Sequence, residues 1–340
     1  MRMLKILGLG ILVLIVLFVG IGLMLPRQVK IERSITIDRP AATVFAVLNG
    51  FKRFNEWSPW AAKDPAAQYT FTGPTFGAGA KLSWEGDPKT VGSGSQAIRL
   101  SVPYSRIGVD LDFDGQGKGK ADFALSPEGS GTRVVWSFDT DLGMSPLSRW
   151  FGLMFESMIG PDYEQGLARL KELVEQLPVT DIAGLTAEVV EVEAVPVAYV
   201  EASCGKDEAE IGRTIADSYA EVTKFLTARK VSPAGPPITI NTRWDDSGYG
   251  FEAALPVDRV PDDPPAADAR VRFKQTYAGR AIKVVHRGAY RDMPPTYDKL
   301  FAWAAAHGFK QDGPPWDEYV SDPGSTPEAE LITNVYLPVE

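Results

Sequence analysis

The stretch from Ile282 to Pro323, IKVVHRGAYRDMPPTYDKLFAWAAAHGFKQDGPPWDEYVSDP, decides the fold of the second half of the chain. Its apolar spacing predicts a strand over Ile282–Val285, a polar turn and a helix over Tyr297–Ala306. Gly313-Pro314-Pro315 then opens a second strand. A strand, a helix and a further strand within so short a stretch indicate an α+β unit.

The second strand contains two acids between two aromatic residues, namely Trp316, Asp317, Glu318 and Tyr319. Carboxylates between large aromatic side chains suit a pocket for an apolar, cationic small molecule. The alternative is a strand end whose acids face water. Composition by itself favours that alternative.

An internal repeat places this stretch in a larger unit. Tyr219 recurs as Tyr297 after 78 positions, and Gly235-Pro236-Pro237 recurs as Gly313-Pro314-Pro315 at the same spacing. Leu255-Pro256-Val257 recurs as Leu337-Pro338-Val339 after 82 positions, which a four-residue insertion near Ser325–Glu328 explains. Each half therefore predicts a strand, a helix and two strands. Two such halves would join their sheets about a pseudo-twofold axis and form a cleft lined by both copies.

The composition excludes several classes of function. The net charge is −9 and the pI is about 5.0, with no cluster of Lys and Arg, which argues against a nucleic-acid partner. The single cysteine, Cys204, rules out an intrachain disulfide. Two histidines, His286 and His307, leave little material for a zinc site. We expect no metal and no cofactor.

The N-terminal segment predicts a membrane anchor over residues 1–28. Ile6 to Leu25 contains no charge, and a helix of that length spans roughly 30 Å, the thickness of the hydrocarbon layer. A cleaved signal peptide is the alternative, but the apolar run is long and no small-x-small cleavage site follows it. Basic residues flank both ends, so the charge rule hardly discriminates between orientations. We expect a single-pass protein of the cytoplasmic (inner) membrane with its soluble domains on the extracytoplasmic side.

Residues 29–178 predict a first soluble α+β domain. Alternating apolar residues over 29–37 indicate a strand, and a short helix follows Pro40. An aromatic loop, 51–60, leads to five hairpin-like segments, which are 80–85, 96–102, 106–113, 120–125 and 132–138. A long helix over 146–176, with an apolar stripe and a kink at Pro161, closes the domain.

This order of elements is that of a helix-grip fold, and several short motifs strengthen the likeness. They are ITIDRP (35–40), WSPW (57–60), GTRVVW (131–136) and MIGPDYEQGL (158–167). Together they resemble the SRPBCC superfamily, which includes START and polyketide-cyclase-like proteins. The resemblance implies a curved antiparallel sheet that grips the long helix around an apolar cavity. Trp60, Trp84, Trp136 and Phe151 would line that cavity, with simple core packing as the alternative.

The second soluble domain, residues 179–340, resembles the GyrI-like effector-binding domain. The motifs VVHRGAY (284–290), GPPWDEY (313–319) and VYLPV (335–339) occur in the order of that family. The resemblance implies small-molecule binding in the central cleft, where a buried Glu followed two residues later by Tyr faces a ligand cation. That acid position falls on Asp317 and the Tyr on Tyr319, whereas Glu318 would point to the opposite face of the strand. Further wall candidates are Tyr290, Trp244 and Tyr249.

These patterns predict a membrane-anchored binding protein that senses or sequesters hydrophobic, cationic compounds. The partners are then a hydrophobic small molecule and the membrane, while protein partners stay unknown. An enzyme is the main alternative, either cyclase-like in the first domain or hydrolase-like in the second. A scaffold with degenerate pockets is the third.

Overall fold

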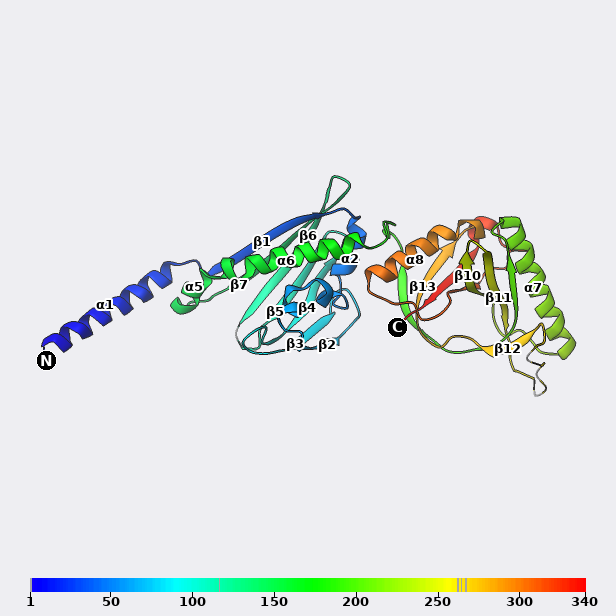
Figure 1. Ribbon diagram of the computed structural model, residues 1–340, viewed down its shortest axis with the longest axis horizontal. Helices are drawn as coiled ribbons and strands as arrows, with labels where there is room; N and C mark the ends of the chain where they lie inside the picture. The colour runs from blue at the N-terminus through cyan, green and yellow to red at the C-terminus, as the bar shows by residue number, and fades with distance from the viewer. Residues whose placement is uncertain (1, 116, 262, 264, 267) are drawn as a thin grey trace. The chain divides into compact units, whose positions relative to one another are not determined.

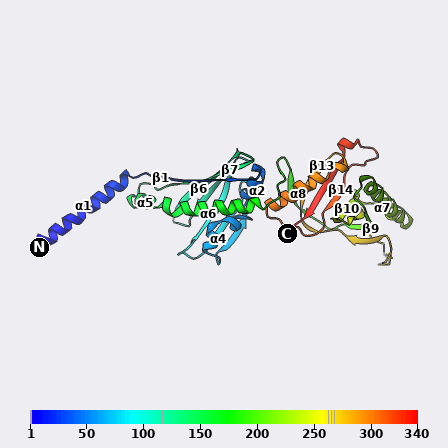
Figure 2. The same cartoon turned by 45° about the horizontal axis from the view of Figure 1, so that its top comes forward.

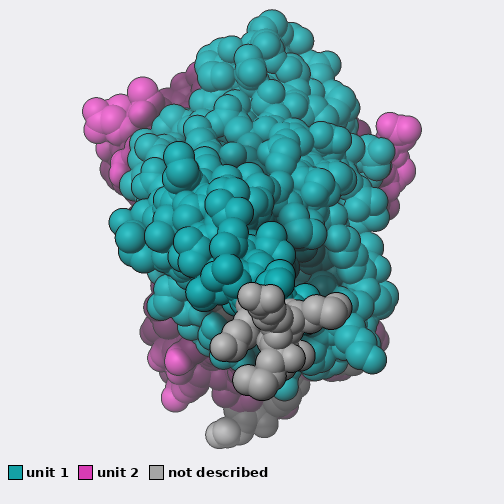
Figure 3. All heavy atoms as spheres, turned by 90° about the vertical axis from the view of Figure 1, so that its left-hand side faces the viewer, with its two compact units in different colours: residues 1–181, 306–308 teal, residues 182–305, 309–340 magenta. Residues whose placement is uncertain are grey.

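The computed structural model describes residues 2–115, 117–261, 263, 265–266 and 268–340. The chain divides into two compact units, one of residues 1–181 and 306–308 and the other of residues 182–305 and 309–340 (Figure 3). Each unit contains one antiparallel sheet (Figure 1). The fold is thus α+β with two separate sheets, as the sequence predicts.

The first helix, α1 (Arg2–Met24), precedes the first sheet. Its segment Ile6–Met24 has a mean hydropathy of 3.0, and its side chains are almost all exposed. Within the described residues it is the one helix long and apolar enough to cross a bilayer. Exposed apolar side chains on so long a helix are what a lipid environment favours.

The sheet of the first unit is a seven-stranded meander in the order β1-β7-β6-β5-β4-β3-β2. Its first strand pairs with its last, from Gln28 opposite Asp141 to Ile37 opposite Thr132. The strands are β1 (Gln28–Ile37), β2 (Gln68–Thr72), β3 (Lys81–Glu85), β4 (Ser93–Val102), β5 (Arg106–Asp112), β6 (Lys118–Glu128) and β7 (Gly131–Asp141). The short edge strand β2 does not follow from the sequence pattern, because nearly all of its side chains are exposed.

Helices cover one face of this sheet (Figure 2). They are α2 (Ala41–Leu48), α3 (Phe54–Trp57), α4 (Pro59–Lys63) and α6 (Phe155–Glu175), whereas α5 (Pro146–Gly152) lies beyond the end of the sheet and contacts α1. Tyr163, Leu167, Leu170 and Val174 of α6 are buried. These residues form the apolar stripe that the helical periodicity of the sequence predicts. Their burial shows that the long helix packs against the sheet through this stripe.

Two expectations for this unit were wrong in detail. The aromatic stretch 51–60 is no loop but contains α3 and the start of α4, which bury Trp57. The helix expected over 146–176 is interrupted between Gly152 and Phe155. Pro161, where the sequence predicts a kink, lies inside the helix α6. A proline removes one backbone donor, and α6 accommodates that loss without ending.

The sheet of the second unit has eight strands in the order β12-β9-β11-β10-β14-β15-β13-β8. The strands are β8 (Ala187–Val192), β9 (Pro196–Cys204), β10 (Ile238–Asp245), β11 (Gly248–Pro256), β12 (Arg272–Gln275), β13 (Gly279–Arg287), β14 (Trp316–Tyr319) and β15 (Ile332–Pro338). The helices are α7 (Glu208–Arg229) and α8 (Pro294–Ala306), with short 3₁₀ turns η1 (Tyr290–Asp292) and η2 (Glu328–Glu330).

The strand order confirms the duplication. The two halves, β9-α7-β10-β11 and β13-α8-β14-β15, meet where β10 pairs with β14 and Thr239 lies opposite Asp317. These two residues are themselves 78 positions apart, so they are counterparts on the pseudo-twofold axis. The four-residue insertion is also confirmed, since Asn241 pairs with Phe251, ten positions on, whereas its counterpart Tyr319 pairs with Thr333, fourteen positions on.

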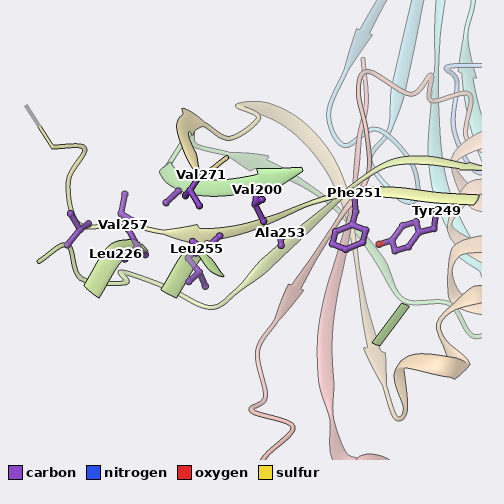
Figure 4. Packing of buried hydrophobic residues seen from close by; sticks show 11 residues of the cluster. Val200, Leu226, Tyr249, Phe251, Ala253, Leu255, Val257 and Val271 are labelled. Carbon is purple, nitrogen blue, oxygen red and sulfur yellow. The ribbon is translucent and has the colours of Figure 1, made fainter. Parts of the chain in front are cut away.

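The core of the first half lies between α7 and the strands β9 and β11 (Figure 4). Leu226 of α7 packs there with Val200 of β9 and with Phe251 and Leu255 of β11. Asp207 caps the start of α7, since its side chain accepts a hydrogen bond from the Glu210 amide at 3.0 Å. This packing fixes the helix over the sheet and determines where its polar residues lie.

Candidate functional site

The strand β14 divides the predicted ligand residues between the two faces of the sheet. Asp317 contacts Tyr297 of α8, and the ring of Tyr319 lies 6.4 Å from that of Tyr219 of α7. Trp316 and Glu318 point to the face without helices. Because side chains alternate along a strand, one ligand cannot contact all four residues through a single face.

Asp317 is a buried carboxylate held by neutral donors. The Tyr297 hydroxyl donates to Oδ1 at 2.6 Å, and the Asn241 side-chain amide donates to Oδ2 at 3.0 Å. The oxygen of that amide accepts from the Tyr249 hydroxyl at 2.5 Å, which orients the amide toward the acid. Asp317 is only 5% exposed. Three elements, α8, β10 and β11, therefore position one carboxyl group.

The electrostatics of this site favour a proton or a cation. Burial raises the pKa of Asp317 from 3.8 to about 6, although the hydrogen bonds from Tyr297 and Asn241 oppose that rise. No Lys or Arg of the described chain forms a salt bridge with this acid. Burial also raises the pKa of Tyr297 and Tyr319 well above their ordinary value, so both hydroxyls stay neutral and able to donate. A buried carboxylate without a positive partner is costly in its charged form.

The pseudo-symmetric counterpart of the Asp317 site is neutral. There the Tyr219 hydroxyl lies 2.9 Å from the Thr239 hydroxyl, where the second half has Tyr297 and Asp317. Duplication accounts for the shared tyrosines, whereas the acid occurs in one copy alone. The carboxyl group of Asp317 therefore lies at the pseudo-twofold axis, but only the second half contributes it.

The remaining wall candidates are increasingly exposed to solvent. Tyr249 is part of the hydrogen-bond chain and is 7% exposed. Tyr290 is 37% exposed, and its ring lies 5.2 Å from that of Tyr319. Trp244 is 59% exposed, and its ring lies 5.4 Å from that of Tyr249. The Lys206 ammonium lies 5.2 Å from the Trp244 ring. Trp244 thus lies at the outer end of the aromatic group.

Sequence reasoning missed four side chains of this site: Tyr219, Thr239, Asn241 and Tyr297. Tyr219 and Tyr297 are landmarks of the repeat, and their shared position on both helices was a signal for a shared role. Thr239 and Asn241 have no such signal, because only the pairing of β10 with β14 brings them to the acid.

On the other face of the sheet, Glu318 belongs to a separate groove of about 480 Å³. Its Oε2 accepts from Asn334 at 2.6 Å and from the Tyr336 hydroxyl at 3.3 Å. The rings of Trp316 and Tyr336 stack at 4.7 Å. Burial, followed by the neighbouring Glu318, raises the pKa of Tyr336 to about 12. A wider groove of about 930 Å³ lies along α7 and β9 and contains none of the predicted residues.

In the first unit the aromatic residues pack into a closed cluster. Trp136 is 2% exposed and stacks on Tyr163 at 3.7 Å, with the ring of Trp60 at 5.8 Å. Trp84 lies apart, beside Phe113, and Phe151 is 53% exposed on α5. The structure therefore brings together Trp60 and Trp136 of the four predicted cavity residues.

This cluster contains polar atoms that need partners. The Trp57 and Trp136 indole nitrogens and the Ser58 hydroxyl are buried, and the described residues offer them no hydrogen-bond acceptor. Buried polar atoms without a partner are uncommon in packed proteins, so these three atoms distinguish the cluster from an ordinary apolar core.

The histidine and cysteine side chains have structural surroundings. The His286 Nδ1 atom is hydrogen-bonded to the Thr296 hydroxyl at 2.8 Å, and its Nε2 atom to the Ala289 carbonyl oxygen at 3.1 Å. These two bonds fix the start of α8. Burial raises the pKa of the Cys204 thiol, so its thiolate is disfavoured.

Comparison with protein families assigns both soluble parts of the chain. Residues 28–175 match the polyketide cyclase / dehydrase and lipid transport family, and residues 186–340 match the GyrI-like small molecule binding domain. The chain is an SRPBCC domain followed by a GyrI-like domain. Both predicted families, and their order, are confirmed. Asp317 and its tyrosines thus lie within the GyrI-like domain, and the buried tryptophan cluster lies within the SRPBCC domain.

Several solved structures are similar to parts of the chain at low identity. The EcmrR–DNA complex in EcmrR-RPo is 16% identical, over 58% of this chain and 72% of that one, with a TM-score of 0.42. A hydrolase from Listeria innocua is 17% identical, over 46% of this chain and 92% of that one, with a TM-score of 0.35. Ara h 8.0201 is 13% identical, over 44% of this chain and 99% of that one, with a TM-score of 0.34. No curated protein matches the chain.

Proposed function

We propose that this chain is a membrane-anchored protein that binds hydrophobic, positively charged small molecules and senses or sequesters them. The observation that carries the proposal is Asp317, a buried carboxyl group with neutral donors and no positive partner in the described chain. A ligand cation would supply the missing charge, and the surrounding tyrosine rings would favour a flat or aromatic body. The GyrI-like family of small-molecule-binding domains supports this assignment.

The proposal includes a pH dependence of binding. A cation pairs with the ionised form of Asp317, whose pKa is about 6 in the free protein. Below that pH the acid must lose its proton before it can pair, so affinity falls by up to about tenfold for each further pH unit. Above pH 7 the affinity becomes independent of this group.

The membrane part of the proposal rests on α1. We propose that residues 1–28 anchor the chain in the inner membrane, with the soluble domains, 29–178 and 179–340, on the extracytoplasmic side. The apolar segment Ile6–Met24 supports the anchor by its length and composition. A reporter enzyme fused after Glu340, active in one compartment alone, tests the orientation.

A thermal-shift experiment tests the ligand site. The full chain in detergent micelles is heated with tetraphenylphosphonium, with ethidium and with a neutral aromatic compound of similar size. We expect a cation to raise the unfolding temperature of the wild type, and Asp317→Asn to lose that shift. Glu318→Gln is the matched control, because it removes a charge one residue away on the opposite face of β14.

Three outcomes contradict the proposal. If no cation shifts the wild type, the Asp317 site has no such ligand. If Glu318→Gln loses the shift and Asp317→Asn keeps it, the ligand binds the groove beside Trp316 instead. If the bound compound is chemically converted, the protein is an enzyme and not a pure binding protein.

A further inference from the structure

The connection between the first sheet and α6 exposes an unusual number of apolar side chains. Residues 142–155, LGMSPLSRWFGLMF, contain one charged residue. Met144 is 69% exposed, Leu147 65% and Phe151 53%. Leu153 and Met154 are also at least half exposed. These five side chains form the α5 apolar face, and a patch of this kind on a folded domain marks an interaction surface.

An adjoining side of α5 is fixed to the membrane-type helix α1. The Trp150 indole nitrogen donates to the Phe18 carbonyl oxygen at 3.0 Å, and the two rings stack at 5.3 Å. Gly22 makes this approach possible, because a Cβ there would lie 2.8 Å from the Cβ of Pro146. Leu147 and Phe151 of α5 stay more than half exposed beside this contact, although α5 itself is held against α1.

The single charge of this segment is turned inward. Arg149 is 7% exposed, and its guanidinium donates to the Leu23 carbonyl oxygen at 2.5 Å and to the Gly143 carbonyl oxygen at 3.1 Å. The arginine thus satisfies the end of α1, where carbonyl groups lack helical partners and a positive charge is favoured. As a result, the outward side of α5 carries no charge.

The depth of α5 along α1 identifies what covers the apolar face. Phe18, which Trp150 contacts, lies six residues before the end of α1 at Met24, or about 9 Å along the helix axis. When α1 spans a bilayer, its last turns lie at the boundary between acyl chains and headgroups. Trp150 then lies at the level where tryptophan is enriched, and α5 lies at the depth of an interfacial helix, about 5–10 Å into the boundary.

We propose that the α5 apolar face inserts into the surface of the same bilayer that α1 spans, so that the SRPBCC domain docks on the membrane through α5. This inference rests on the membrane anchor of the proposed function. The occupant is lipid, because α5 packs on α1 through Trp150, whose partner Phe18 lies among the exposed apolar side chains of α1, and because Arg149, the one charge of residues 142–155, is buried. The Arg27–Asp141 ion pair, at 2.6 Å, closes the adjoining end of the sheet and remains in water, with both side chains exposed.

Brominated lipids test the docking directly. The full chain, with Cys204→Ser to remove its one cysteine, is placed as one copy per nanodisc of phosphatidylcholine and phosphatidylglycerol. Phe151→Cys carries an environment-sensitive nitrobenzoxadiazole label. We expect a blue-shifted emission and loss of most of its intensity when dibrominated phosphatidylcholine replaces the ordinary lipid.

Ser130→Cys is the matched control, because this exposed residue precedes β7, at the opposite end of that strand from Asp141. Its label should keep the emission of a water-exposed dye and resist the brominated lipid. If the label at 151 behaves like the label at 130, the docking is overturned, while retention of the chain in the nanodisc still shows the anchor. If the chain does not enter nanodiscs, the anchor itself fails. A label at 151 that is blue-shifted only with two copies per disc means that a second chain covers the face, which also overturns the docking on lipid.

Discussion

At the scale of single residues, Asp317 links the stability of the second unit to pH. Its pKa is about 6 in the folded chain, against an ordinary value of 3.8, so the folded state holds the proton more tightly between those values. Stability therefore falls as pH rises from about 4 to about 6 and stays lower above that range. The full effect is roughly 3 kcal/mol. Hydrogen exchange of the β10 and β14 amides, corrected for intrinsic rates, measures it.

Asp317→Asn should remove this part of the pH dependence, since an amide does not titrate. The comparison between the two proteins cancels the contribution of the other acids, which are the same in both. Equal pH slopes in the wild type and the variant would show that Asp317 is ionised throughout and that its burial has no cost.

The two pseudo-symmetric tyrosines give a second prediction at this scale. Tyr297 donates to a carboxylate at 2.6 Å, whereas Tyr219 lies 2.9 Å from the neutral hydroxyl of Thr239. Hydrogen bonds to charged groups contribute about 1.5–3 kcal/mol and neutral ones about 0.5–1.5 kcal/mol. At pH 8, Tyr297→Phe should therefore destabilise the unit more than Tyr219→Phe. Denaturation monitored by hydrogen exchange compares them, and equal losses would contradict an ionised Asp317.

At the scale of elements, the packing of α5 on α1 depends on one glycine. Gly22→Ala should displace α5, because the new Cβ would lie 2.8 Å from the Cβ of Pro146 and 3.0 Å from the Trp150 indole nitrogen. Gly20→Ala is the control, since its Cβ meets nothing within 4 Å. We expect faster hydrogen exchange over residues 146–152 in the first variant only. Unchanged exchange in both would mean that α5 does not need this contact.

The strands show what a local pattern can predict. Alternation along β14 predicts that Asp317 and Glu318 lie on opposite faces, and the structure has them so. The same rule fails for β2, where side chains on both faces are exposed and no alternation exists. It also cannot foresee the break after Gly152, because the apolar spacing of α5 and α6 is continuous in the sequence. The apolar side chains of α5 are exposed and not part of the core. The sequence pattern does not show this, because it depends on the packing of α5 against α1.

At the scale of the whole molecule, the Asp317 site is contained in one unit. Tyr297, Asn241 and Tyr249 all belong to residues 182–305 and 309–340, as does the whole eight-stranded sheet. We therefore expect residues 182–340, expressed alone, to fold and to keep the pH-dependent stability of the full chain. Circular dichroism during urea unfolding at pH 4.5 and pH 7.5 measures this. A fragment that folds but shows no pH difference would mean that groups outside it raise the pKa of Asp317.

The sequence by itself determined the two families, the duplication and the apolar first helix, because each is a periodic or repeated pattern along the chain. It also singled out Asp317, through its register with Tyr319. Only the tertiary structure decided which side chains surround that acid, since Asn241 and Tyr297 reach it by strand pairing and helix packing across distant residues. It likewise decided that Phe151 is exposed beside α1 and not in the core. Burial depends on which surfaces meet, and a linear pattern does not contain that information.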